Sequence, residues 1–229
     1  MMRDTGAERG GHAELESFLG LLSHELRTPV TTIYAGARLL ARGEPLSSAT
    51  RRELASNIGA EAERLFRLIE DLLVIARAER GLLEANRERV ALRPLLAEMT
   101  RLEATQWPTN PFEVAGDDDL PPVAGDSRFI RQVLRNLLGH VAVLRTEREP
   151  VRAWIEQDRE TLRVRIVVLP DAAAAPARVA GPPAGLGSGP IGLFAARHLV
   201  QAMDGELWVR TDPDASVECG FALPIYRPA

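Results

Sequence analysis

The sequence predicts an α+β protein: an antiparallel helical hairpin that forms a dimeric four-helix bundle, followed by an α/β sandwich with helices on one face of a mixed sheet. Three observations lead to this prediction. Residues 13–42 and 48–80 each carry a single helical stripe of apolar residues. The composition changes after Gly81, where segments become short. Strand-like and helix-like segments then mix without strict strand–helix–strand alternation, which favours a mixed sheet over an all-parallel one.

The two long segments have the periodicity of amphipathic helices. At 100° per residue, the apolar positions of 13–42 fall within a band of roughly 60°, and 48–80 repeats the pattern at near-seven spacing. Pro45 breaks the pattern between them, and Ser47 or Ser48 can cap the second helix. One hairpin buries little apolar surface, so we expect a homodimer. The apolar positions are Leu15, Leu19, Leu22, Leu26, Ile33, Ala37 and Leu40, then Leu54, Ile58, Leu65, Leu68, Leu72 and Ile75.

The second half of the chain contains shorter elements. Asp126 or Ser127 is expected to cap a helix, Gly205 to close another, and Cys219 to lie in the core of a strand. In chain order we expect a short strand and a helix over 85–104, a strand and a turn-rich loop over 111–126, a helix over 126–144, strands over 151–157 and 161–170, a long loop over 171–190, a helix over 191–203, and a final hairpin over 206–225.

Composition excludes several classes of function. The chain has 229 residues, and its apolar fraction of 45% is typical of a globular protein. Its net charge of −4 gives no indication of a general affinity for nucleic acid. All 28 basic residues are arginine, which excludes chemistry that needs a lysine. Cys219 is the single cysteine, so an intrachain disulfide is impossible. No apolar run is long enough to span a membrane and the N-terminus lacks a signal core, so we expect a cytoplasmic location.

One histidine stands out in the first helical segment. His24 lies about 180° from the centre of the apolar stripe, so it is expected to face solvent, where an ordinary surface histidine is the alternative. Glu25 can accept a proton from the imidazole Nδ1, which leaves Nε2 as a nucleophile. Thr28 lies one turn further on the same face, and Pro29 can kink the helix just beyond. These residues are suited to accept a phosphoryl group.

The stretch "SHELRTPVTTI" closely resembles the H-box of sensor histidine kinases. The resemblance makes 13–82 the dimerisation and phosphoacceptor hairpin and 86–229 a kinase-like ATP-binding domain. It implies that His24 accepts a phosphoryl group and passes it to an aspartate of a response regulator receiver domain. It also implies that Glu25 is the base for phosphorylation, and that Thr28 positions a water during dephosphorylation of the regulator. ATP and Mg²⁺ are the cofactors that it implies, and another histidine kinase is a further candidate partner.

The second half departs from the family pattern at its chemical positions. "RQVLRNLLGHVAVL" resembles the N-box, in which Asn136 matches, but His140 stands at the magnesium-binding asparagine and Val143 at the lysine. Pro170 occupies the position of the adenine-binding aspartate, with Asp171 one residue later. Imidazole is a poor substitute for the oxygen ligands that magnesium prefers. A glycine-rich turn before a helix survives better and offers backbone amides to phosphate at Gly187, Gly189 and Gly192.

The acceptor site therefore looks intact while the donor site looks degenerate. We expect phosphoryl transfer through His24 in a two-component signalling protein, with weak or absent ATP binding. One alternative is a working kinase with an unusual ATP site. A second is a histidine phosphotransferase or regulator phosphatase that does not bind ATP. A third, from another class, is a non-catalytic dimeric scaffold that binds response regulators. Nucleotide binding separates the first two alternatives.

Overall fold

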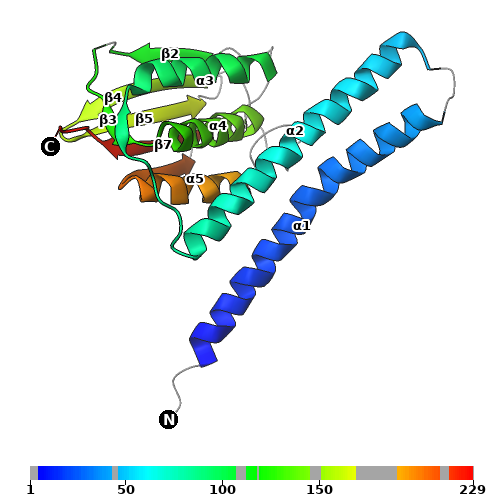
Figure 1. Cartoon of the computed structure of the whole chain (residues 1–229), viewed down its shortest axis with the longest axis horizontal. Helices are drawn as coiled ribbons and strands as arrows, with labels where there is room; N and C mark the ends of the chain where they lie inside the picture. The colour runs from blue at the N-terminus through cyan, green and yellow to red at the C-terminus, as the bar shows by residue number, and fades with distance from the viewer. Residues whose placement is uncertain are drawn as a thin grey trace. The chain divides into compact units, whose positions relative to one another are not determined.

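The computed structural model of the chain describes residues 5–42, 46–106, 112–117, 119–144, 151–168, 190–211 and 217–228. These residues form five helices and seven strands (Figure 1). Their contacts divide the chain into two compact units, Met1–Ile69 and Glu70–Ala229. The predicted domains, 13–82 and 86–229, place the boundary later in the chain and remain a prediction. Each unit is described separately below.

The first unit is the expected helical hairpin. Helix α1 (Thr5–Ala41) and helix α2 (Ser48–Glu79) run antiparallel, side by side (Figure 1). Ser47 caps α2, because the backbone N–H of Thr50 donates to its Oγ at 3.0 Å. Pro29 lies inside α1 and is buried, and the helix continues through it.

Close contact between the two helices depends on a small residue. Gly36 of α1 is buried, and a Cβ atom added there would lie 3.0 Å from Cγ1 of Ile58 in α2. A larger side chain would therefore push the helices apart.

A glycine ends helix α2. Gly81 has a φ of 66°, and the N–H of Leu82 donates to the carbonyl of Arg77 at 2.8 Å. This left-handed cap ends α2 after Glu79.

The second unit is built on a five-stranded mixed sheet with the order β2-β4-β5-β7-β6. Strand β2 (Phe112–Gly116) pairs in parallel with β4 (Val151–Asp158), and all other neighbours are antiparallel. The remaining strands are β5 (Thr161–Val168), β7 (Val217–Pro224) and β6 (Glu206–Thr211). Antiparallel neighbours can be joined by a tight turn. A short polar turn therefore connects β4 to β5, and Arg159 in this turn has a positive φ of 52°.

The structure contains a second sheet of two strands, and the sequence predicts only the first of them. Strand β1 (Glu88–Val90) pairs antiparallel with β3 (Val123–Gly125), in a region where the sequence predicts a turn-rich loop. Val123 has no exposed surface, and it also forms a bridge with Ile225 after β7. A segment of three residues carries no periodicity, so only the partner strand reveals it.

Three helices cover one face of the large sheet: α3 (Leu92–Gln106), α4 (Ser127–Leu144) and α5 (Pro190–Ala202) (Figure 1). Alternate residues of β4 face them, because Val151, Ala153 and Ile155 are buried while their neighbours are not. Two layers with one shared core form the predicted α/β sandwich. The largest fully buried side chains are Phe221, Leu92, Leu96, Ile130, Leu134, Leu137, Leu138, Leu162, Ile166, Ile191, Leu199 and Met203.

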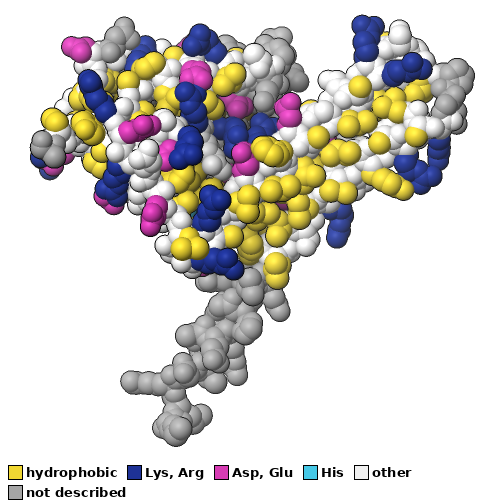
Figure 2. All heavy atoms as spheres, in the orientation of Figure 1, with side chains coloured by type: hydrophobic (Ala, Val, Ile, Leu, Met, Phe, Trp, Pro, Cys, Tyr) yellow, Lys and Arg dark blue, Asp and Glu magenta, His cyan; other side chains and the backbone are white. Residues whose placement is uncertain are grey.

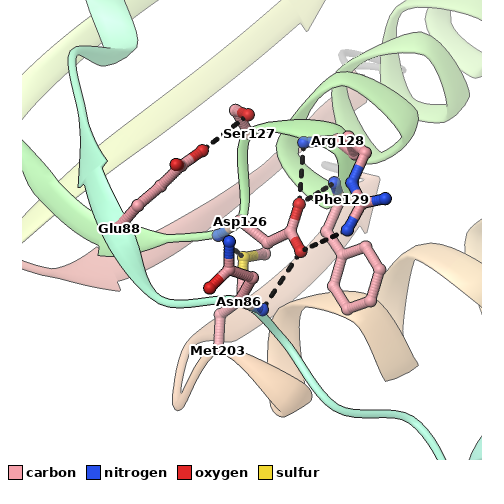
Figure 3. Close-up of polar contacts among 7 residues, drawn as sticks. All are labelled: Asn86, Glu88, Asp126, Ser127, Arg128, Phe129 and Met203. Atoms are coloured by element: carbon pink, nitrogen blue, oxygen red, sulfur yellow. Dashed lines mark hydrogen bonds and ion pairs between the residues drawn. The ribbon is translucent and has the colours of Figure 1, made fainter.

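Asp126 caps α4 and fastens the segment that follows α2 to it (Figure 3). Its Oδ1 accepts hydrogen bonds from the backbone N–H groups of Arg128 at 2.9 Å and Phe129 at 3.4 Å. Its Oδ2 accepts a third from the N–H of Asn86 at 3.1 Å. Ser127, the other candidate cap, instead donates its hydroxyl to Glu88. One buried carboxylate thus satisfies the first turn of α4 and orients the chain that enters the second unit.

Candidate functional site

The predicted acceptor turn lies in the first unit, on α1. His24 is exposed there, as expected from its position opposite the apolar stripe, while Glu25 and Thr28 are partly buried. Pro29 directly after this turn is buried. The hydroxyl of Thr32 donates to the backbone carbonyl of Thr28, one turn earlier in the same helix, at 3.2 Å. The turn thus presents one imidazole to solvent beside a carboxylate and a hydroxyl.

The carboxylate of Glu25 has a partner on the other helix. Arg64 of α2 donates from Nη2 to Oε2 of Glu25 at 2.9 Å. Both side chains are largely shielded, with 15% of Arg64 and 12% of Glu25 exposed. Arg64 also lies near Glu61, one turn earlier on α2, with Nη1 at 3.8 Å from Oε2. A shielded pair between two elements holds both side chains in place far better than an exposed pair does.

The candidate nucleotide residues fall in the second unit and only some can be located. Asn136 on α4 has no exposed surface, and its Nδ2 donates to Asp71 Oδ1 and to the carbonyl of Gly192, both at 2.9 Å. Gly192 is buried near the start of α5, and His140 is half-buried one turn beyond Asn136. The other predicted positions lie outside the described residues: Gly187, Gly189, Pro170 and Asp171.

Asp71 is the centre of a buried polar cluster that joins three helices. Its Oδ1 also accepts a hydrogen bond from Nε2 of Gln132 at 2.8 Å. Burial raises the pKa of Asp71, and the hydrogen bonds from Asn136 and Gln132 and the charge of Arg135 act in the opposite direction. Beside it, Arg135 donates to Glu70 at 2.9 Å. The cluster fixes the last turns of α2 to α4, and through Asn136 to α5.

The burial of Asn136 limits its access to a ligand. A residue without exposed surface, such as Asn136, reaches a ligand only if the surrounding helices move. Among the described residues, no group of three or more histidine, cysteine or carboxylate side chains is placed to hold a metal ion. Within those same ranges, no helix is both long and apolar enough to cross a membrane.

Reasoning from the sequence missed Arg64, Asp71 and Gln132. Asp71 carries a detectable signal, because it lies three residues after Leu68 and four before Ile75, beside the edge of the apolar stripe of α2. A carboxylate at the edge of such a stripe needs a partner when it is buried, and the sequence does not reveal which residue supplies it. Arg64 lies at the same edge of the stripe, and the sequence does not reveal that Glu25 is its partner.

Comparisons with known proteins agree with the geometry of the hairpin. Residues 14–81 match the His Kinase A (phospho-acceptor) domain. Over 232 aligned residues, the chain is 29% identical to the sensor protein TorS of Escherichia coli (strain K12), covering 96% of this chain and 25% of TorS. The chain thus spans about a quarter of the length of that relative.

Solved structures extend the likeness to both units. Full-length ShkA, in complex with AMPPNP, has a TM-score of 0.60 and 25% identity, covering 93% of this chain and 46% of that one. The histidine kinase ThkA, in complex with the response regulator TrrA, has a TM-score of 0.62 and 20% identity, covering 95% of this chain and 64% of that one. Residues 14–81 therefore match the phospho-acceptor domain of histidine kinases, and the similarity over both units identifies this chain as a histidine kinase-like two-component signalling protein.

Proposed function

We propose that His24 accepts a phosphoryl group and exchanges it with an aspartate of a response regulator receiver domain. The observation that carries this proposal is the exposure of His24 on α1, within the part of the chain that matches the phospho-acceptor domain. Imidazole is a good acceptor because its Nε2 is nucleophilic while Nδ1 carries the proton. The complex of ThkA with TrrA supports a response regulator as the partner.

Two neighbours supply the rest of the chemistry. Glu25 accepts the Nδ1 proton as Nε2 attacks phosphorus, so the imidazole does not carry a positive charge in the product. Thr28, one turn away on the same helix, is close enough in sequence to orient a water against an aspartyl phosphate in the docked regulator. The chain would then act as a phosphotransferase or as a regulator phosphatase at the same surface.

The acceptor hairpin acts as a homodimer in this proposal. Several large apolar side chains remain exposed on the first unit, and Figure 2 shows hydrophobic side chains gathered along the hairpin. At 100° per residue, the exposed apolar residues of α1 lie within about 60° of one another around the helix, so they form one face. The exposed apolar residues of α2 also form one face. A second hairpin would cover both faces. The exposed residues are Leu19, Val30 and Tyr34 on α1, and Phe66 and Ile69 on α2.

The second unit binds ATP weakly or not at all in this proposal. Asn136 is buried with its amide donated to Asp71 and Gly192, and His140 replaces an oxygen ligand of magnesium. The AMPPNP complex of ShkA favours the alternative, an ATP-dependent kinase. Isothermal titration with Mg-ATP decides between them. We expect no saturable binding in the micromolar range, and micromolar affinity would restore the kinase interpretation.

Phosphorylation of His24 is tested by supplying a phosphorylated receiver domain of the cognate regulator. We expect acid-labile, alkali-stable phosphate on the wild-type chain and none on His24→Ala. His12→Ala, which removes another histidine of α1, is the matched control and should be labelled like the wild type. Label that persists in His24→Ala would contradict the proposal.

A further inference from the structure

The pair formed by Arg64 and Glu25 has a geometry that suits a role in proton transfer. The residues are 39 positions apart, yet Nη2 of Arg64 lies 2.9 Å from Oε2 of Glu25. Arg64 donates to Oε2 of Glu25 alone, and within the described residues no group donates a hydrogen bond to Oε1. An arginine that donates to one carboxylate oxygen leaves the other oxygen able to accept a proton, and it fixes the orientation of the carboxylate.

Arg64 also separates two carboxylates. Glu61 lies on the same helix as Arg64, and its Oε2 is buried and makes no hydrogen bond among the described residues. Its counter-charge is Arg64, at 3.8 Å. Without the guanidinium, Glu25 and Glu61 would face each other as like charges in a shielded part of the hairpin, and Glu25 would turn toward water.

We propose that Arg64 is a positioning residue for phosphoryl transfer at His24: it holds Glu25 so that Oε1 receives the Nδ1 proton. This inference rests on the proposed function of His24. With phosphoramidate as donor, the Nε2 lone pair of His24 forms a bond to phosphorus, and the P–N bond breaks with its electron pair leaving as ammonia. The Nδ1 proton moves to Oε1 of Glu25. Arg64 touches neither the phosphoryl group nor the imidazole in this step, and it acts through Glu25 alone.

The test measures the rate of phosphohistidine formation on the full chain with phosphoramidate, by intact mass and ³¹P NMR. Arg64→Gln should slow labelling roughly tenfold, a fraction of what a general base contributes. Arg64→Lys keeps a positive charge and should recover part of the rate. Arg52→Gln is the matched control, because Arg52 is exposed on α2 and donates to the carbonyl of Ser48 in its own helix. It should label at the wild-type rate.

The double variant Arg64→Gln/Glu25→Gln distinguishes positioning from a general loss of structure. If Arg64 acts through Glu25, the double variant should label no more slowly than Glu25→Gln alone. Wild-type labelling of Arg64→Gln, or additive losses in the double variant, would overturn the role of Arg64 and leave His24 as the acceptor. A wild-type chain that gains no label beyond that of His24→Ala would overturn the proposed function, and this inference with it.

Discussion

Asp71 offers the sharpest test of how the second unit is held together. Only 3% of it is exposed, and its Oδ1 accepts hydrogen bonds from Gln132 at 2.8 Å and Asn136 at 2.9 Å. Asp71→Ala removes the shared acceptor and leaves two amide donors facing an apolar gap. Asp71→Asn keeps an acceptor at Oδ1, where both hydrogen bonds are made, and replaces the charged carboxylate with a neutral amide. The two substitutions therefore separate the hydrogen bonds from the charge.

The size of each effect follows from these contacts. A hydrogen bond to a charged group is worth about 1.5–3 kcal/mol, and Asp71→Ala breaks two. Asn136 keeps its bond to the carbonyl of Gly192, and half-buried Gln132 can turn to water, so part of the loss is recovered. We expect Asp71→Ala to lower the free energy of unfolding of the second unit by about 2–4 kcal/mol. Asp71→Asn should stay within about 1 kcal/mol of the wild type.

The pH dependence has a defined sign. Burial raises the pKa of Asp71 above its ordinary value of 3.8, so the folded state holds this proton more tightly than the unfolded chain does. The contribution of Asp71 to stability is therefore greatest below pH 3.8 and falls as the pH rises through the folded pKa. Asparagine does not titrate. The stability of Asp71→Asn relative to the wild type should therefore increase with pH across this window.

Tryptophan fluorescence during guanidinium unfolding measures these differences. All three tryptophans, Trp107, Trp154 and Trp208, belong to the second unit, so the signal reports on that unit. Asp117→Ala is the matched control, because Asp117 is exposed in the loop after β2, and it should change the free energy of unfolding by less than about 0.5 kcal/mol. The reasoning is refuted if Asp71→Ala unfolds at the wild-type midpoint, or if Asp71→Asn is as unstable as Asp71→Ala.

Two further predictions concern the helix cap and the hairpin. Asp126→Ala removes the acceptor of the first turn of α4 and should lower the free energy of unfolding of the second unit by about 1–2 kcal/mol in the same assay, whereas Ser127→Ala should change it little. Phe66→Glu places a charge on the exposed apolar face of α2 and should weaken dimerisation at least about tenfold by sedimentation equilibrium. Asn57→Glu, about 180° away on α2, should not. A wild-type monomer at micromolar concentration would contradict the dimer.

The sequence by itself determined the elements whose signals are local. Helical periodicity predicted the hairpin, and alternating residues predicted the strands that became β4, β5 and β7. The exposure of His24 followed from the same periodicity, because a residue opposite an apolar stripe faces away from the neighbour that the stripe contacts. Capping positions were found to within one residue, since Ser47 and Asp126 were among the candidates.

Tertiary structure alone decided which residues meet. Strand β3 exists because β1 pairs with it, and its three residues have no pattern of their own. Arg64 and Glu25 meet because two helices run antiparallel with a particular register, which a seven-residue spacing does not specify. The place of Asn136 in a motif predicts a nucleotide contact, and only the packing shows that its amide is buried against Asp71 and Gly192. Partners far apart in the chain are chosen by the geometry of packing, and no single segment contains that geometry.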